Sequence, residues 1–275
     1  MKDFFRFACL GFFAGLTVLR AVESDDKVVT FTEQQDGKAV RLVAWVRDGA
    51  DVTVTLEADL QNVTSSHPLP YTFDLSGQRS AVAVIVRAAD AAAAWRYQYR
   101  FFWSLGTRQG RPEASAIYRL PFAQNETHRL QQGNFGHFSH GQGSQNERAF
   151  DFRMPVGTTV CAARAGTVCG ARSDSTAGGV SPVFKQRANY VIIRHADGTY
   201  AEYFHLATDG VKVRIGETVV AGQPIALSGN TGFSSEPHLH FCVFRTLDGK
   251  TRETLPALFR VGGGKPESLV EGRSY

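Results

Sequence analysis

Short bursts in which apolar and polar residues alternate run along most of this chain, and this two-residue period constrains its fold more than any other feature. In residues 27–122 the bursts are VVTFTE, AVRLVAWV, VTVTLEA, AVAVIVRAA and WRYQYRFFW. Such a period places successive side chains on opposite faces of a β-strand. Asp-Gly turn signals stand at 36–37 and 48–49. We therefore predict antiparallel strands that form an immunoglobulin-like β-sandwich over residues 22–122.

The second half of the chain is also predicted to be β. Its strand-like runs are TTVCAARAGTVCG, NYVIIRH, TYAEYFHL, ETVVAGQPIALSG and LHFCVF, and glycines at 216, 222 and 229 indicate tight turns between short strands. We expect a compact antiparallel β-sheet domain with small, barrel-like strands over residues 134–260. A polar connector at 123–133 would precede this domain, and a C-terminal tail at 261–275 would follow it. The chain as a whole is predicted to be mostly β.

Composition excludes several classes of protein. The chain has 275 residues, a net charge of +4, 43% hydrophobic and 20% charged residues, which are values typical of a soluble globular protein rather than a disordered or coiled-coil one. Since no dense Lys/Arg run accompanies the small charge, we expect no nucleic-acid partner. A mildly basic surface is compatible with an anionic polymer such as a cell wall.

The N-terminus is typical of a secretory signal peptide. Lys2 and Arg6 precede an apolar run at 7–19, which is shorter than the roughly 20 apolar residues that span a bilayer. We predict a signal peptide over residues 1–21 and an exported protein, in the periplasm or outside the cell, with no stable membrane insertion after cleavage. The alternative is an uncleaved anchor.

Three cysteines follow the predicted signal peptide, and two of them are spaced for a cross-strand pair. A three-residue hairpin loop at 164–166 would place Cys161 opposite Cys169, with Cβ atoms about 4.5–5.5 Å apart. Our hypothesis is that these two cysteines form a disulfide. Cys242 is expected to be a small buried residue rather than a metal ligand.

Histidines and one aspartate in the second half indicate a metal site. On a strand, His238 and His240 would face one side while their apolar neighbours pack on the other. Asp151 stands between two phenylalanines, where a carboxylate is costly to bury unless it is paired or bound to metal. His205 ends a further strand-like run. Catalytic zinc generally takes three protein ligands and a water. Together with His140, these residues are two imidazoles more than one zinc site needs, and the two extra imidazoles could act as acid–base or electrostatic groups.

Three segments closely resemble the lysostaphin-type zinc metallopeptidases, the peptidoglycan endopeptidases of the LytM and beta-lytic type. They are SHGQGSQNERAFDFRMPVGTTVCAARAGTV, NYVIIRHADGTYAEYFHL and VVAGQPIALSGNTGFSSEPHLHF, within residues 133–243. The resemblance implies that His140, Asp151 and His240 bind Zn²⁺ and that His205 and His238 are catalytic. One departure from the family is that ten residues separate His140 from Asp151, where the best-known members have three. His137 is the competing candidate for this ligand. We favour His140 because Ser-His-Gly before an aromatic-flanked Asp matches relatives with longer loops.

The resemblance implies a zinc metalloendopeptidase that hydrolyses the peptide cross-links of bacterial peptidoglycan with a metal-activated water. The alternative is a non-catalytic wall-binding or amidase-activating module on the same fold. Because degenerate modules of that kind lose zinc ligands, the complete set of five residues favours an enzyme. The N-terminal sandwich is expected to position the enzyme without contributing to its site, so a fragment that begins near Gln124 should keep its zinc. The oligomeric state is left open.

Overall fold

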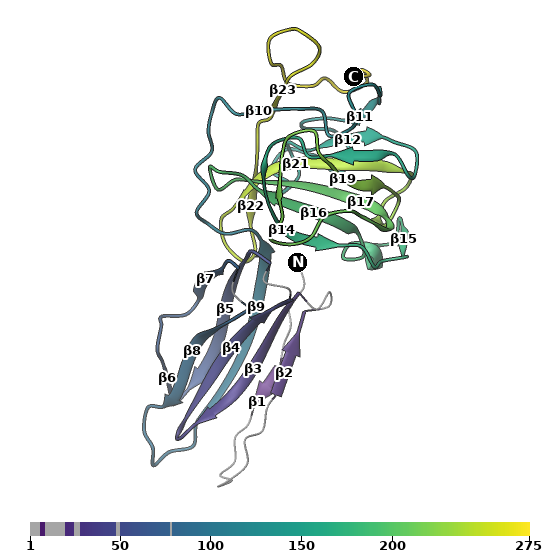
Figure 1. Ribbon diagram of the computed structural model, residues 1–275. Coiled ribbons are helices and arrows are strands. Elements are labelled where there is room, and N and C mark those ends of the chain that lie inside the picture. The colour runs from purple at the N-terminus through teal and green to yellow at the C-terminus, as the bar shows by residue number, and fades with distance from the viewer. Residues whose placement is uncertain (1–5, 9–19, 25–27, 48–49, 78) are drawn as a thin grey trace. The chain divides into compact units, whose positions relative to one another are not determined.

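The computed structural model describes residues 6–8, 20–24, 28–47, 50–77 and 79–275 (Figure 1). It divides into two compact units, of which unit 1 comprises Met1–Thr107 with Leu247–Thr251 and unit 2 comprises Arg108–Thr246 with Arg252–Tyr275. Antiparallel sheets dominate both units, and η2 (Pro182–Phe184) is a single 3₁₀ turn. The prediction of a mostly β protein is confirmed.

Unit 1 contains two antiparallel sheets. One has the strand order β1 (Arg6–Ala8), β9 (Arg96–Leu105), β5 (Val52–Gln61) and β7 (Tyr71–Leu75). The other has the order β2 (Arg20–Glu23), β3 (Val29–Asp36), β4 (Ala39–Val46), β8 (Ser80–Ala88) and β6 (Val63–Ser65). The sheets pack through Phe31 of β3 and Phe101 of β9, whose ring centroids lie 4.6 Å apart. The expected strands are present, and the immunoglobulin-like character stays a prediction.

The alternation that predicts these strands also determines which side chains they bury. From Val29 to Glu33, every second residue of β3 is buried, because alternate side chains of a strand face the opposing sheet. The Asp-Gly pair at 36–37 forms the turn between β3 and β4, where Gly37 has a φ of +58° that favours glycine. The second Asp-Gly pair, at 48–49, lies outside the described residues.

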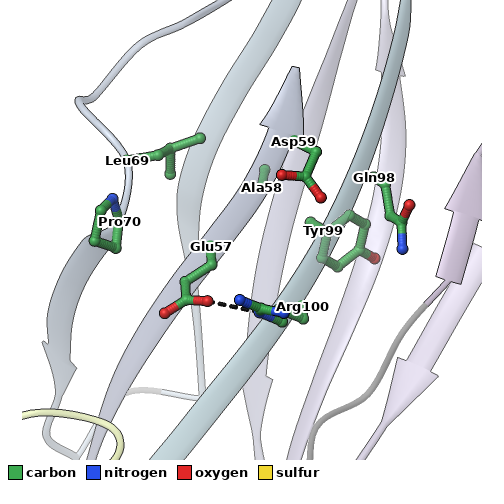
Figure 2. Close-up of a pocket in the computed structure, with 8 residues that line it drawn as sticks. All are labelled: Glu57, Ala58, Asp59, Leu69, Pro70, Gln98, Tyr99 and Arg100. Atoms are coloured by element: carbon green, nitrogen blue, oxygen red, sulfur yellow. Dashed lines mark hydrogen bonds and ion pairs between the residues drawn. The ribbon is translucent and has the colours of Figure 1, made fainter. Parts of the chain in front are cut away.

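Unit 1 also has a cavity of about 220 Å³ (Figure 2). Residues from β5, β9 and the segment before β7 line it: Glu57, Ala58, Asp59, Leu69, Pro70, Gln98, Tyr99 and Arg100. Two of its charged groups are paired, because Arg100 Nε donates to Glu57 Oε2 at 2.6 Å. No cluster of potential metal ligands occurs among the described residues of unit 1.

The predicted signal peptide falls mostly outside the part of the chain that the structure describes, because residues 1–5 and 9–19 are not covered. Residues 6–8 and 20–23 are strands β1 and β2. The signal peptide therefore stays a prediction. Within the described ranges, the protein has no helix with the length and apolar character that crossing a membrane requires.

Unit 2 is built around a ten-stranded sheet. Its main path runs in the order β11 (Leu130–Gln132), β12 (Phe150–Arg153), β21 (His238–Thr246), β17 (Tyr200–Val211), β16 (Asn189–Arg194), β14 (Gly166–Arg172) and β18 (Thr218–Val219). Three further strands join it: β13 (Thr159–Cys161), β19 (Pro224–Ser228) and β22 (Arg252–Leu255). Two short parallel ladders pair β10 (Ile117–Tyr118) with β23 (Leu258–Phe259) and β15 (Gly178–Gly179) with β20 (Gly232–Phe233).

The core of unit 2 lies on one face of this sheet. Phe150, Phe152, Tyr203 and Phe241 are fully buried there, and their alternate neighbours on the same strands point to the other face. The predicted connector at 123–133 contains β11, which pairs with β12. The domain limits drawn from the sequence stay predictions.

The hypothesis of a disulfide between Cys161 and Cys169 is wrong. Both residues are buried thiols. Their strands do not form the expected hairpin, because β13 pairs with β19, where Cys161 lies opposite Pro224. Cys169 instead belongs to β14, which pairs with β16 and β18, and its Sγ donates to Ile192 O at 3.6 Å. The residues at 164–166 therefore connect two strands that take different partners.

Candidate metal centre

The neighbouring strands β12 and β21 bring a carboxylate and two imidazoles to the face of the sheet opposite the core. In their antiparallel register, Asp151 pairs with His240 and Arg153 pairs with His238. The alternate residues Phe152, Leu239 and Phe241 face the core. The Asp151 carboxylate is mostly buried, and its Oδ1 lies 2.8 Å from His240 Nδ1. The two-residue alternation along β12 and β21 therefore explains why the apolar side chains pack in the core and why Asp151, His238 and His240 lie on the opposite face.

His140 reaches Asp151 from the loop before β12. Its side chain has no exposed surface, and its Nε2 lies 3.3 Å from Asp151 Oδ2. Its Nδ1 lies 3.1 Å from the carbonyl oxygen of Gly133, which can only accept, so Nδ1 carries the proton. The competing candidate, His137, is exposed and does not belong to the cluster. Of the two histidines, the structure brings only His140 to Asp151.

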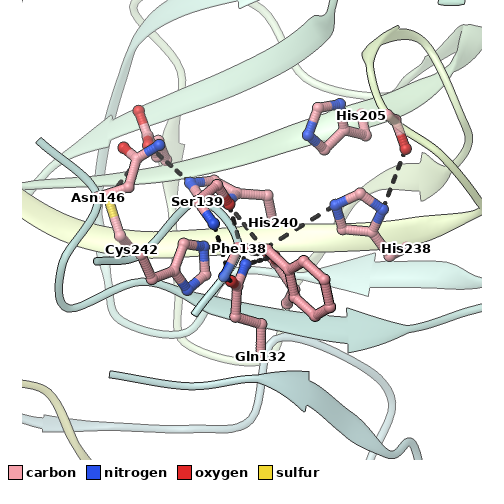
Figure 3. A network of polar contacts seen from close by, with 12 residues as sticks. Gln132, Phe138, Ser139, Asn146, His205, His238, His240 and Cys242 are labelled. Atoms are coloured by element: carbon pink, nitrogen blue, oxygen red, sulfur yellow. Dashed lines mark hydrogen bonds and ion pairs between the residues drawn. The ribbon is translucent and has the colours of Figure 1, made fainter. Parts of the chain in front are cut away.

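Gln132 of β11 holds this loop in place, as Figure 3 shows. Its Oε1 accepts hydrogen bonds from the backbone N–H groups of Phe138 and Ser139, both at 2.9 Å. Its Nε2 donates to Asp151 Oδ2 at 2.8 Å. One amide side chain thus fixes both the loop that carries His140 and the carboxylate that His140 faces. Sequence analysis missed Gln132 because it lies in the segment expected to be a connector.

The ligand atoms of His140, Asp151 and His240 all lie within 4.8 Å of one another. His140 Nε2 is buried without a hydrogen-bond partner, although buried polar groups are normally paired. Burial raises the pKa of Asp151, but His140 and His240 outweigh that effect and hold it well below its usual range. Two imidazole nitrogens and one ionised carboxylate are a donor set that suits Zn²⁺. The residues therefore fit a metal ion at this position.

His205 joins this face through an irregularity in β17. Tyr203 lies opposite Phe241 and faces the core, so strict alternation would also turn His205 towards the core. Instead, the register between β16 and β17 skips His205, whose φ is +64°. This bulge leaves the imidazole beside His238 at a ring-centroid distance of 4.5 Å.

Backbone carbonyls orient the two remaining imidazoles. His205 Nδ1 lies 2.7 Å from the carbonyl oxygen of Thr231, and His238 Nδ1 lies 2.8 Å from that of Glu236. Each Nδ1 therefore donates, which leaves Nε2 of both rings as the acceptor in the neutral form. His238 Nε2 is 3.9 Å from Asp151 Oδ1. Burial lowers the pKa of His205 to about 3, with further contributions from His238 and His240.

A second carboxylate lies at the other ring nitrogen of His240. Glu202 of β17 is fully buried, and its Oε1 lies 3.2 Å from His240 Nε2. Cys242 is buried as expected, and its Sγ donates to the same oxygen at 3.1 Å. Sequence analysis missed Glu202 because a single acidic residue in an apolar strand carries no recognisable motif. Its paired charge, Arg252, lies 50 residues further along the chain.

Comparisons with known proteins show what part of this chain is similar to a described peptidase family. Residues 145–252 match the model of peptidase family M23. The chain is 40% identical over 91 residues to peptidoglycan DD-endopeptidase ShyA of Vibrio cholerae, covering 33% of this chain and 18% of that protein. It is 35% identical over 123 residues to lysostaphin of Staphylococcus simulans, covering 44% of this chain and 23% of that protein.

Among solved structures, this chain is similar to the catalytic domain of the antimicrobial peptidase lysostaphin from Staphylococcus simulans. The match has 27% sequence identity and a TM-score of 0.34, and it covers 47% of this chain and 87% of that chain. The matches to ShyA and to full-length lysostaphin span less than two thirds of those relatives' lengths.

Proposed function

Residues 145–252 form a peptidase family M23 domain, and from this premise we propose that the protein is a zinc metalloendopeptidase that hydrolyses peptide cross-links of bacterial peptidoglycan. The observation that carries the proposal is the convergence of five side chains on one face of the unit 2 sheet. Three of them form the candidate metal-binding cluster, and two more imidazoles lie against it: His140, Asp151, His240, His205 and His238.

In this proposal, three residues hold Zn²⁺. His140 contributes Nε2, Asp151 contributes its carboxylate and His240 contributes Nδ1, the atoms that face one another in the cluster. When bound, Zn²⁺ acts as a Lewis acid that polarises the peptide carbonyl and lowers the pKa of a bound water towards about 7. Hydrogen bonds from Gln132 to Asp151 and from His140 to the Gly133 carbonyl keep two of the ligands oriented.

His205 and His238 are the proposed acid–base residues. Because both donate through Nδ1 to backbone carbonyls, each neutral ring presents an Nε2 lone pair to the site. That nitrogen can accept a proton from the nucleophilic water, and the protonated ring can return it to the leaving amine. Burial lowers the pKa of His205 to about 3, so its ring is neutral at physiological pH and offers Nε2 as a hydrogen-bond acceptor.

The substrate and the location of the protein are part of the proposal. ShyA is named as a peptidoglycan endopeptidase, and its similarity to this chain supports a peptidoglycan peptide as substrate. The basic and apolar N-terminus supports export to the periplasm or beyond. The complete set of candidate ligands and acid–base residues favours an enzyme over a non-catalytic wall-binding or amidase-activating module.

The test is to incubate the zinc-loaded protein with defined digests of peptidoglycan and to identify the products by mass spectrometry. We expect cross-linked peptides to take up one water and separate, a strong chelator to abolish the reaction and added Zn²⁺ to restore it. His238→Ala is the matched control, because it removes an acid–base group and leaves the three proposed ligands in place. Cross-linked peptides that survive with a zinc-loaded protein would instead support the non-catalytic module.

A further inference from the structure

The carboxylate of Glu202 is the most deeply buried charge beside the candidate metal centre, and neither metal binding nor proton transfer uses it. Its side chain has no exposed surface and lies on β17, in register with Cys242 of β21. A carboxylate buried in this way is unfavourable unless it is paired and its lone pairs are satisfied. The partners of Glu202 therefore show what it does.

Arg252 of β22 supplies the opposite charge. Its Nη2 donates to Glu202 Oε1 at 2.7 Å, and its Nη1 donates to Oε2, so the pair is bidentate. The guanidinium is itself held, because Nη2 also donates to Asn146 Oδ1 at 2.7 Å and the group lies over the ring of Phe244, 4.8 Å from its centroid. These contacts fix the position of the Glu202 carboxylate and keep it ionised.

This fixed carboxylate determines which nitrogen of His240 carries a proton. Glu202 Oε1 lies 3.2 Å from His240 Nε2, and an ionised carboxylate can only accept a hydrogen bond. Nε2 must therefore bear a proton. Nδ1 faces Asp151 at 2.8 Å, and without a metal it donates to that carboxylate in the same way, so the Nδ1 proton is the one that a metal ion would displace. A metal ligand needs its lone pair on the side of the metal, so the protonation state that Glu202 imposes is the one that metal binding requires.

We propose that Glu202, fixed by Arg252, is a positioning residue that holds His240 in the tautomer and orientation needed to bind the metal. This inference rests on the proposed function for the identity of the metal. Carboxylates that orient a ligating imidazole commonly change metal affinity by about 10- to 100-fold when they are removed. Glu202 itself contacts Nε2 of His240 and not the metal-facing Nδ1.

The test variant is the double substitution Glu202→Leu with Arg252→Met, studied in the full chain. Removing both charges avoids leaving either one buried and unpaired, and apolar replacement of a buried ion pair often maintains stability. The matched control is Cys242→Ala, which removes another contact to Glu202 Oε1 and leaves the pair with His240 intact. Zinc affinity is measured by competition with a chromophoric chelator, and the melting temperature is measured without metal.

We expect the double variant to melt close to the wild type and to bind zinc about 10- to 100-fold more weakly, with Cys242→Ala unchanged. ¹⁵N chemical shifts of labelled histidine, measured without metal, should show a proton held on Nε2 of His240 in the wild type and lost from Nε2 in part of the double variant. Wild-type zinc affinity in a folded double variant would overturn the inference, as would an equal loss in Cys242→Ala. If the wild type binds zinc in this Glu202-dependent way but cuts no peptidoglycan peptide, only the proposed function fails. A wild type without zinc affinity overturns both.

Discussion

At the scale of single residues, the two histidines of β21 differ although they are two positions apart on one face. His240 is enclosed by two carboxylates, with Asp151 at Nδ1 and Glu202 at Nε2. His238 is bound through Nδ1 to the Glu236 carbonyl and lies 3.9 Å from the nearest oxygen of Asp151. The first environment suits a metal ligand, and the second suits a group that meets water and substrate.

Alanine substitution should separate these roles. His240→Ala removes one of three proposed ligands, so we expect zinc affinity to collapse and the buried Asp151 to reduce stability. His238→Ala and His205→Ala leave the ligands intact, so zinc content should stay at about one per chain while turnover falls about 10²-fold or more. Metal content per folded chain and peptide-cleavage rate are measured together. Zinc retained by the His240 variant but lost from the His238 variant would reverse the assignment.

His195, which is not part of the candidate metal centre, should make stability depend on pH. It is 3% exposed, and its Nδ1 donates to the Ala165 carbonyl at 2.9 Å. Burial is the main cause that lowers its pKa to about 4, and the nearby Arg164 lowers it further. Between about pH 4 and 6.5 the unfolded chain binds a proton here that the folded chain does not. The contribution of His195 to the free energy of unfolding is therefore fully present above pH 6.5 and is lost as the pH falls towards 4.

The measurement is guanidinium unfolding at pH 7 and pH 5 with a chelator present. His195→Asn keeps a donor for the Ala165 carbonyl and removes the titrating group, so it is the matched comparison. From pH 7 to pH 5 the wild type should lose about 2 kcal/mol more unfolding free energy than the variant. An equal loss in both proteins would contradict the prediction.

At the scale of elements, the bulge in β17 turns the side chain of His205 away from the core and towards His238. Thr231 supports it twice, since its carbonyl accepts from His205 Nδ1 and its hydroxyl donates to the Leu206 carbonyl at 2.8 Å. The buried Asn189 donates its backbone N–H to the same hydroxyl at 2.9 Å. Its side chain also bonds to the backbone of Ser175 through both amide atoms, each at 2.8 Å. Three segments are thereby tied together around His205.

Thr231→Val tests this support because it preserves shape and removes only the hydroxyl. The Leu206 carbonyl and the Asn189 N–H then each lose a hydrogen-bond partner, so the unfolding free energy should fall by about 1–3 kcal/mol. With His205 less firmly placed, peptide cleavage should fall by about 10-fold or more, while zinc content should stay unchanged. Thr218→Val, at an exposed position of β18, is the control. Wild-type turnover in the Thr231 variant would show that the bulge does not depend on this hydroxyl.

The elements also show what the sequence could and could not predict. Two-residue alternation predicted β3, β4, β5, β8 and β9 because it directly reflects which side chains face a core. It also placed His238 and His240 on one face. It failed for Cys161 and Cys169, because alternation specifies faces and not strand partners. Glu202, Asn189 and Gln132 were missed for a related reason: each acts through contacts that only the tertiary fold creates.

At the scale of the whole molecule, every residue of the proposed site belongs to unit 2. The sequence-based expectation was that a fragment beginning near Gln124 would keep the site. The structure places earlier residues in the same unit, with Tyr118 of β10 and Phe122 buried in its core. Arg119 donates its backbone N–H to the Ala163 carbonyl at 2.8 Å. A fragment intended to fold should therefore begin at Arg108.

We predict that residues 108–275 fold, bind about one zinc per chain and cleave a small soluble peptide, because unit 2 contains every residue of the proposed site and a continuous core. Residues 124–275 should be less stable, since a large buried apolar side chain contributes about 1.5–3 kcal/mol and both Tyr118 and Phe122 are lost. Guanidinium unfolding, zinc content and peptide cleavage are measured on both fragments and on the full chain. A lower rate on intact cell wall than on the soluble peptide, for the 108–275 fragment alone, would fit a positioning role for unit 1. A folded 108–275 fragment that binds no zinc would mean that unit 1 is required to form the metal site.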